Sequence, residues 1–136
     1  MQGGVNMKTE GKELLSKYIK SCVSPILLNK TYAGVFKNPV VIESDCSLDL
    51  LNGHYEGDKF IAPGWYNELI QRKTPVLLIN GINNIPTEQQ YRFIEILKYR
   101  KVNTFELPSN CVIVATYSDL EKKPISEELY SLMAQI

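Results

Sequence analysis

At three places in this 136-residue chain, a short apolar run is followed by residues whose positions could serve phosphate chemistry. Lys30-Thr31 follows the first run, and phosphate-binding loops hold phosphates and Mg²⁺ with a lysine followed by serine or threonine. Asn80-Gly81 follows a second run, where many nucleotide hydrolases carry an acidic pair, and Ser118 follows a third. Asparagine brings no negative charge, and glycine cannot act as a base. The sequence therefore predicts the frame of a nucleotide hydrolase without its acids.

The segment around Lys30 is short and poor in glycine. A phosphate-binding loop needs glycines ahead of its lysine so that backbone N–H groups can wrap the phosphates, and none lies between Pro25 and Lys30. About eleven residues separate Leu28 from Val40, which is the lower limit for a parallel crossover that carries a helix. We therefore expect the phosphate loop and most of its helix to be absent. In the simpler interpretation, Lys30 is a surface lysine in a turn.

Four apolar segments, at residues 26–28, 40–42, 76–79 and 111–115, predict buried strands. In each segment the apolar residues follow one another without alternating polar residues, as expected for a strand covered on both faces. Segments of helical period are expected at residues 9–22, 65–72 and 124–133, and Thr87 with Gln90 fits a capping box that opens another helix. Trp65 is expected to be a packing anchor. The alternation predicts an α/β fold, a three-layer sandwich around a mostly parallel central sheet.

Composition predicts one globular domain at residues 9–136. The segment before it, residues 1–8, is rich in glycine, and we expect it to be disordered or tag-derived. Lys+Arg 15 balances Asp+Glu 15, so there is no general attraction for nucleic acid or anionic membrane. The cations of residues 98–101 suit the negative pole of a helix dipole. No apolar run approaches the roughly 20 residues of a membrane span, and we expect a cytoplasmic protein without membrane contact.

No residue set predicts a metal site or a cofactor. Cys22, Cys46 and Cys111 have no paired CxxC spacing, and buried structural roles are expected for them. His54 is the only histidine and has no cysteine or carboxylate cluster beside it, so a solvated loop residue is the simpler interpretation. We therefore expect neither metal nor cofactor.

Five short motifs occur in an order shared with one known family. They are Leu-Leu-Asn-Gly-His-Tyr at 50–55, Phe-Ile-Ala-Pro-Gly-Trp at 60–65, Leu-Leu-Ile-Asn-Gly-Ile-Asn at 77–83, Ile-Pro-Thr-Glu-Gln-Gln at 85–90 and Val-Ile-Val-Ala-Thr-Tyr-Ser at 112–118. Together, over residues 25–133, they resemble the AAA+ ATPase family, most closely its MoxR-like and dynein-related branch. The resemblance implies a truncated P-loop NTPase core without the helical lid.

The resemblance also implies which functional groups are missing. It places the family's magnesium-binding acid at Asn80, its water-polarising glutamate at Gly81 and its γ-phosphate sensor at Ser118. The Asp-Arg pair that supplies an arginine finger falls at Ser131 and Leu132. Because phosphoryl transfer depends on positioning and charge stabilisation by such groups, we expect no ATP hydrolysis. The degenerate nucleotide-site positions are Lys30, Thr31, Asn80, Gly81 and Ser118.

Two segments are candidates for recognition. Residues 52–59 form a polar, turn-rich loop that, in the resembling family, lies near a central pore or a partner surface. Residues 101–108 predict a short irregular strand or hairpin, and family members use a comparable excursion to touch partners or DNA. The candidate contact residues of the first segment are Gly53, His54, Tyr55 and Glu56.

The leading hypothesis is a non-catalytic AAA+-like module that binds another protein, either a true AAA+ or replication-type ATPase or a second copy of itself. The competing hypothesis is a nucleic-acid-binding, clamp-loader-like subunit without ATPase activity, which the balanced charge does not support. A third is a residual ATP binder that uses Lys30, Thr31 and Ser118. A fourth is a decaying remnant of a mobile-element gene.

Overall fold

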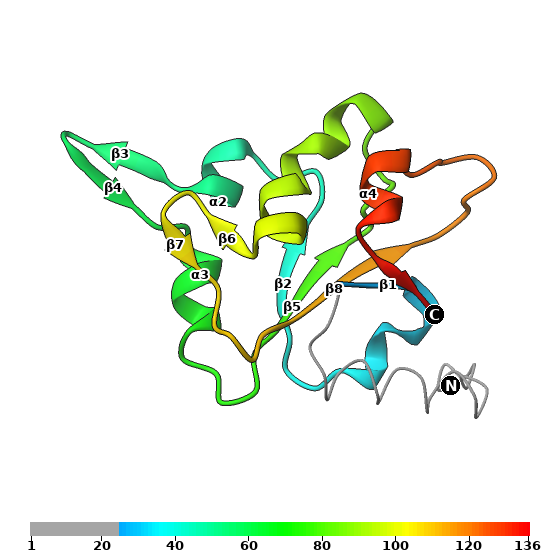
Figure 1. The fold of residues 1–136 in the computed structure, drawn as a ribbon, viewed down its shortest axis with the longest axis horizontal. Coiled ribbons are helices and arrows are strands. Elements are labelled where there is room, and N and C mark those ends of the chain that lie inside the picture. Colours follow the sequence, from blue (N-terminus) through cyan, green and yellow to red (C-terminus); the bar gives the residue numbers. More distant parts are fainter. Residues whose placement is uncertain (1–24) are drawn as a thin grey trace.

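The computed structural model describes residues 25–136, which form a five-stranded parallel sheet with helical segments packed against it (Figure 1). The strand order is β2-β5-β8-β1-β9, and all neighbours are parallel. The prediction of an α/β fold with a mostly parallel central sheet is confirmed. The expected helix at residues 9–22, Cys22 and the residue 1–8 segment lie outside the described residues. The strand bounds are β1 (Ile26–Asn29), β2 (Val40–Glu43), β5 (Val76–Asn80), β8 (Val112–Tyr117) and β9 (Ala134–Gln135).

Continuous apolar sequence accounts for the buried central strands. In β5, Leu77 and Ile79 belong to the larger core cluster, whereas Leu78 belongs to the cluster on the opposite face. In β8, Ile113 and Val114 divide between the two clusters in the same way. Successive side chains of a strand point to opposite faces, so an unbroken apolar run buries both of them. The four predicted strands are all present, with ends that differ by one or two residues.

Helical segments lie on both faces of the sheet, but most belong to one. Figure 1 shows α2 (Leu48–Asn52), α4 (Glu127–Ser131) and the yellow-green stretch formed by η2 (Thr87–Phe93) and η3 (Glu95–Tyr99) on the same side. α3 (Gly64–Leu69) contributes Trp65 and Leu69 to this larger cluster. On the other face, η1 (Lys30–Val35) packs Tyr32 and Ala33 against the second cluster. The connection from β1 to β2 thus contains a 3-10 helix and no α-helix, in agreement with its short length.

Two antiparallel hairpins extend from the helix-covered side. The first pairs β3 (His54–Glu56) with β4 (Lys59–Ile61) and projects at the left of Figure 1. The prediction of a loop at residues 52–59 is therefore wrong, because Tyr55 and Phe60 form a cross-strand aromatic pair, with ring centroids 5.1 Å apart, that stabilises strand pairing. The second hairpin pairs β6 (Lys101–Val102) with β7 (Phe105–Glu106), which confirms the hairpin expected at residues 101–108.

The helical stretch after Pro86 begins differently from its prediction. Pro86 is the N-cap of η2, no side chain caps this end, and Thr87 is already the first helical residue. The predicted capping box is wrong because the Gln90 amide is fully buried and serves other segments. Its Nε2 donates to the carbonyl oxygens of Ile85 and Pro124. Hydrogen bonds to other segments, rather than the local capping motif, therefore decide where the Gln90 side chain lies.

The C-terminal region contains the expected helix, shortened to α4, and one strand that the sequence did not predict. β9 continues the sheet beyond β1, pairing Ala134 with Ile26 and Gln135 with Leu27. A strand of two residues is too short to show periodicity. Within residues 25–136, none of the helices has the length and apolar character needed to cross a membrane.

Candidate functional site at the carboxyl end of the sheet

The carboxyl ends of the parallel strands meet at one edge of the sheet, where the degenerate nucleotide-site positions gather. The strand registers place Glu43 beside Asn80, and Asn29 beside Tyr117. Open parallel sheets bind ligands in the crevice outside these ends. Asn80, Gly81 and Ser118 lie here as expected, and η1 starts from the same edge at Lys30.

Asn80 is held by hydrogen bonds to two neighbouring strands. Its Nδ2 donates to both carboxylate oxygens of Glu43, at 2.9 and 3.2 Å, and its Oδ1 accepts from the Thr116 hydroxyl at 3.2 Å. An amide can satisfy both neighbours because it carries a donor and an acceptor. A carboxylate at this position would carry no donor and would face the charge of Glu43. Asn80 therefore closes a polar network between β2, β5 and β8.

Gly81 extends the same network through its backbone. Its N–H donates to the Thr116 hydroxyl at 2.9 Å, and its carbonyl accepts from the Ser44 hydroxyl at 2.6 Å. Gly81 has φ +68°, and a Cβ atom built on it would lie 2.1 Å from Asn84 Nδ2. A glutamate here would require left-handed backbone and displacement of Asn84. This geometry favours glycine, which itself carries no side chain that could act as a base.

Ser118 is bound through its main chain. Its N–H donates to Asn83 Oδ1 at 3.4 Å, and Asn83 Nδ2 donates to the carbonyls of Ser118 and Lys123, each at 2.7 Å. Asn83 is only 2% exposed. Three further polar residues at this edge, Asn83, Thr116 and Ser44, were not predicted as site residues. The sequence signal that could have found them is a polar residue close to the end of a continuous apolar run, where burial requires hydrogen-bond partners.

Lys30 and Thr31 lie on the exposed first turn of η1. Asn29 Oδ1 accepts from both the Thr31 N–H and the Thr31 hydroxyl, at 3.0 Å each. The Thr31 N–H and the hydroxyl proton are thus engaged by Asn29, two residues earlier in the chain. The local geometry is a capped 3-10 turn, in which Lys30 is an exposed lysine.

Asn80→Asp is expected to destabilise the protein by about 1 kcal/mol near neutral pH, because it replaces a donor to Glu43 with a second negative charge. Asn84→Asp is the matched control, since Asn84 Oδ1 already accepts from Lys123 Nζ at 3.5 Å. For the control we expect a change within about 0.5 kcal/mol. Urea denaturation of both variants measures the difference. Equal stability of the two variants would contradict a structural role for the Asn80–Glu43 contact.

Cys46 and Arg92 fix the loop that follows β2. Arg92 Nη1 donates to the carbonyls of Cys46, at 2.8 Å, and Ser44, at 3.4 Å, while the buried Arg92 Nε has no hydrogen-bond partner. Burial raises the pKa of the Cys46 thiol, and the positive charge of Arg92 partly opposes this shift. A thiol with a raised pKa stays protonated at neutral pH and is a poor nucleophile. Cys46 is half-buried and Cys111 buried, so a packing role suits both.

The four candidate recognition residues do not form one accessible loop. Gly53 is buried at the end of α2, with φ +83°, and its N–H donates to Asp49 O. Gly53 is therefore inaccessible in this structure, and its role as a contact residue stays a prediction. His54, Tyr55 and Glu56 form the exposed strand β3, in which His54 Nε2 lies 3.4 Å from Glu56 Oε1.

An aromatic row connects the two hairpins to α3. Tyr55 contacts Phe60, whose ring stacks on Phe105 of the second hairpin at 5.7 Å, and Phe105 contacts Tyr66 at 5.4 Å. The Tyr66 hydroxyl also donates to Glu106 O at 2.7 Å. Next to this row, Trp65 is buried and donates to Leu51 O, which agrees with its predicted role as a packing anchor. The row places the hairpins against one another and ends at Tyr55, which is 67% exposed.

Among residues 25–136, no group of three or more histidine, cysteine, aspartate or glutamate side chains could hold a metal ion. Around Asn80 the carboxyl edge thus offers amides, hydroxyls and backbone groups that bond to each other, together with the Glu43 carboxylate, which accepts from Asn80. These contacts join the strand ends and stabilise the loops that follow them. No model of a known protein family matches the chain, and no curated protein matches it.

Proposed function

We propose that this chain is a non-catalytic AAA+-like module that binds another protein through its paired hairpins. The partner is either an AAA+ or replication-type ATPase or a second copy of the chain. The observation that carries the proposal is the aromatic row, which ties both candidate recognition segments into one surface with an exposed tyrosine at its end.

The sheet topology supports an AAA+-like core. Numbered 1 to 5 along the chain, the five described strands of the sheet lie in the order 5-1-4-3-2. The first strand, which the resemblance assigns to the phosphate loop, therefore lies inside the sheet between two parallel neighbours. The hairpins also occur at the two segments that the resemblance assigns to contacts with partners. Fold alone does not imply activity, so the function must be argued from the carboxyl edge and the hairpins.

The carboxyl edge supports the absence of hydrolysis. Phosphoryl transfer requires groups that bind Mg²⁺, orient the water and stabilise the developing charge. At the equivalent positions, Asn80 and Thr116 bond to each other, and Gly81 contributes only backbone. The Thr31 hydroxyl is bonded to Asn29. This network stabilises the fold without any contribution from nucleotide.

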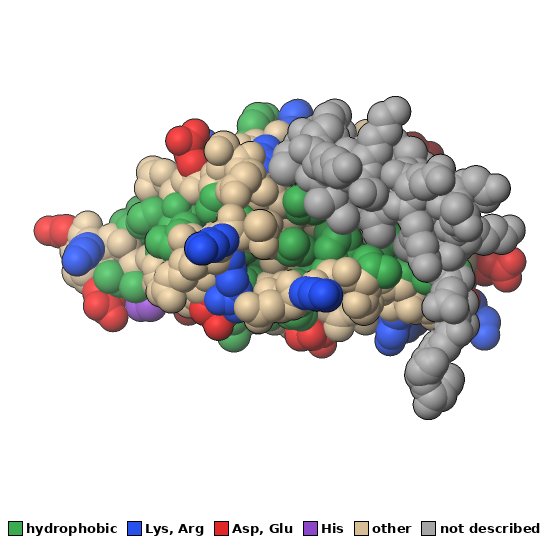
Figure 2. Space-filling model, turned by 90° about the horizontal axis from the view of Figure 1, so that it is seen from below, with side chains coloured by type: hydrophobic (Ala, Val, Ile, Leu, Met, Phe, Trp, Pro, Cys, Tyr) green, Lys and Arg blue, Asp and Glu red, His purple; other side chains and the backbone are tan. Residues whose placement is uncertain are grey.

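The hairpins support protein binding because their exposed surface is aromatic and of mixed charge, and the left end of the molecule in Figure 2 shows hydrophobic, acidic and basic side chains side by side. Tyr55 is flanked by His54 and Glu56 and lies opposite Phe60, with Lys59 nearby on the second strand. Interfaces between proteins are enriched in tyrosine and phenylalanine at their centres. A nucleic-acid surface would instead need clustered cations, and the whole chain has equal numbers of basic and acidic residues.

Tyr55→Ala is expected to weaken capture of the partner at least about tenfold, because truncation of an exposed interface tyrosine removes a large contact area. Tyr91→Ala is the matched control: Tyr91 is 64% exposed but lies on η2, away from the aromatic row. Pull-down from host extract measures capture, and light scattering tests self-association. Equal capture by the two variants, or a monomer that captures nothing, would contradict the proposal.

Two further measurements separate the competing functions. A phosphate-release assay is expected to show no ATP turnover, and turnover that disappears in Lys30→Ala would contradict the absence of catalysis. A gel shift with DNA that weakens steeply as salt rises would favour a nucleic-acid-binding subunit instead. Heat from ATP and Mg²⁺ in calorimetry would favour a residual nucleotide binder.

A further inference from the structure

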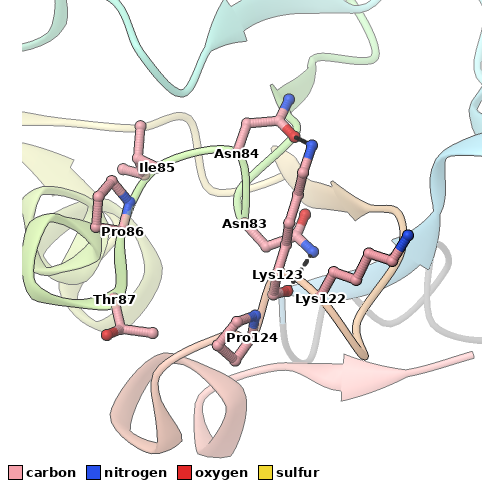
Figure 3. A pocket seen from close by; sticks show the side chains of 8 residues that line it. All are labelled: Asn83, Asn84, Ile85, Pro86, Thr87, Lys122, Lys123 and Pro124. Carbon is pink, nitrogen blue, oxygen red and sulfur yellow. Dashed lines mark hydrogen bonds between the residues drawn. The ribbon is translucent and has the colours of Figure 1, made fainter.

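A small open hollow lies between the loops that follow β5 and β8, on the carboxyl side of the sheet (Figure 3). Its volume is about 220 Å³. Typical small-molecule pockets measure about 300–1,000 Å³, so a nucleotide is too large for it, whereas a single small ion or side-chain group can be accommodated. We call it the lysine hollow; its lining residues are Asn83, Asn84, Ile85, Pro86, Thr87, Lys122, Lys123 and Pro124.

Two buried amides fix the walls of the lysine hollow. Asn83 bonds to the carbonyls of Ser118 and Lys123, which joins the loop after β5 to the loop after β8. Gln90 is fully buried and bonds to the carbonyls of Ile85 and Pro124, which joins the same two loops at their far ends. The hollow is therefore a preorganised part of the fold rather than a gap between independent loops.

The lining of the hollow carries positive charge on two exposed lysines, and the nearby Glu88 carboxylate, which does not line it, is engaged by Thr87. The lining includes two lysines and no acidic residue. Within the described part of the chain, the sole ion pair is His54 with Glu56, so neither lysine is paired with a carboxylate. The Thr87 hydroxyl donates to Glu88 at 3.2 Å and is not available to a ligand. Lys123 Nζ contacts Asn84 Oδ1 at 3.5 Å, as the dashed line in Figure 3 shows, and the Asn84 nitrogen points away from Lys123 in the same view.

We propose that the lysine hollow binds a small oxyanion, either a phosphoryl group or a carboxylate. The first donor is the Lys123 ammonium, which the Asn84 Oδ1 contact holds beside the hollow. Lys122 projects away from Thr87 in Figure 3 and reaches the anion by rotation of its flexible side chain. Hydrogen bonds between ammonium groups and anionic oxygens are about twice as strong as neutral ones. The inference does not depend on the proposed function, because it requires no partner protein.

Titration of the full chain with inorganic phosphate and, separately, with succinate tests this site. At constant ionic strength, the amide NMR resonances of residues 83–87 and 122–124 are expected to shift saturably, with a Kd on the order of 1 mM. The double variant Lys122→Gln/Lys123→Gln should weaken binding at least about tenfold. Saturation with phosphate alone identifies a phosphoryl group, saturation with succinate alone a carboxylate, and saturation with both a general oxyanion site.

The control variant Lys37→Gln/Lys59→Gln removes the same charge from exposed lysines that do not line the hollow. It should bind as the unmodified chain does. The proposal is overturned if these amides show no saturable shift with either anion. It is equally overturned if the two double variants bind alike, because attraction to overall charge would then explain the shifts.

Discussion

Gly53→Ala is expected to destabilise the protein by about 3 kcal/mol or more, because the added methyl group meets backbone that cannot easily move. Gly53 has φ +83° and ψ −171°, a backbone conformation that is essentially restricted to glycine. A Cβ atom there would lie 2.3 Å from the carbonyl oxygen of Ile61 and 2.9 Å from the Phe60 ring. The carbonyl belongs to strand β4, so relief of the clash requires the β3–β4 hairpin to move.

Gly57→Ala separates the cost of backbone strain from the cost of the steric clash. Gly57 also has positive φ, at +62°, but a Cβ atom there would meet nothing within 4 Å. We expect it to cost about 1 kcal/mol, from backbone strain alone. Chemical denaturation measures both variants, and partner capture should fall with Gly53→Ala more than with Gly57→Ala. Similar stability losses in the two would show that the close approach of Gly53 to Ile61 is unimportant.

Gln90→Ala is expected to lower the free energy of unfolding by about 3 kcal/mol, because it leaves three backbone groups, one buried and two part-buried, without their side-chain partner. Gln90 is fully buried, and its amide bonds to Ile85 O, Pro124 O and the Ser126 N–H. These groups belong to the loop after β5 and to the entry of α4. The substitution therefore loosens the attachment of α4 to the rest of the fold.

Gln89→Ala provides the control one position earlier, where the side chain is exposed. Its expected change is within about 0.5 kcal/mol, since alanine is a good helix former. Gln90→Glu keeps an acceptor for the Ser126 N–H but loses both donations, so it should resemble Gln90→Ala. Urea denaturation followed by circular dichroism compares the three. If Gln90→Ala and Gln89→Ala are equally stable, the buried amide does not hold the loops.

The central strands could be predicted because their cause is local. Continuous apolar runs such as Val76–Ile79 specify burial on both faces, and the short segment before Val40 limits the first crossover. β3 and β9 could not be predicted, since β3 depends on the pairing of Tyr55 with Phe60 and β9 on two backbone contacts with β1. Cross-strand partners lie outside the window that sequence periodicity uses.

The carboxyl-edge site was predicted in part. Asn80, Gly81 and Ser118 follow apolar runs, and parallel strands place such residues on one edge. Their chemical environment was not predictable, because the partners of Asn80 come from β2 and β8, about 37 residues away in either direction. The capping-box prediction for Gln90 failed for the same reason: its amide bonds to Pro124, a residue far along the chain.

The position of β1 within the sheet has a consequence for synthesis. β1 is the first described strand along the chain, yet its neighbours are β8 and β9, with Ile26 opposite both Val114 and Ala134. At about 5–20 residues per second, a ribosome needs roughly 4 to 18 s to proceed from Ile26 to Val114. During this interval the apolar β1 segment has been synthesised but its pairing partners have not. We therefore expect chaperones to bind the nascent chain mainly at β1.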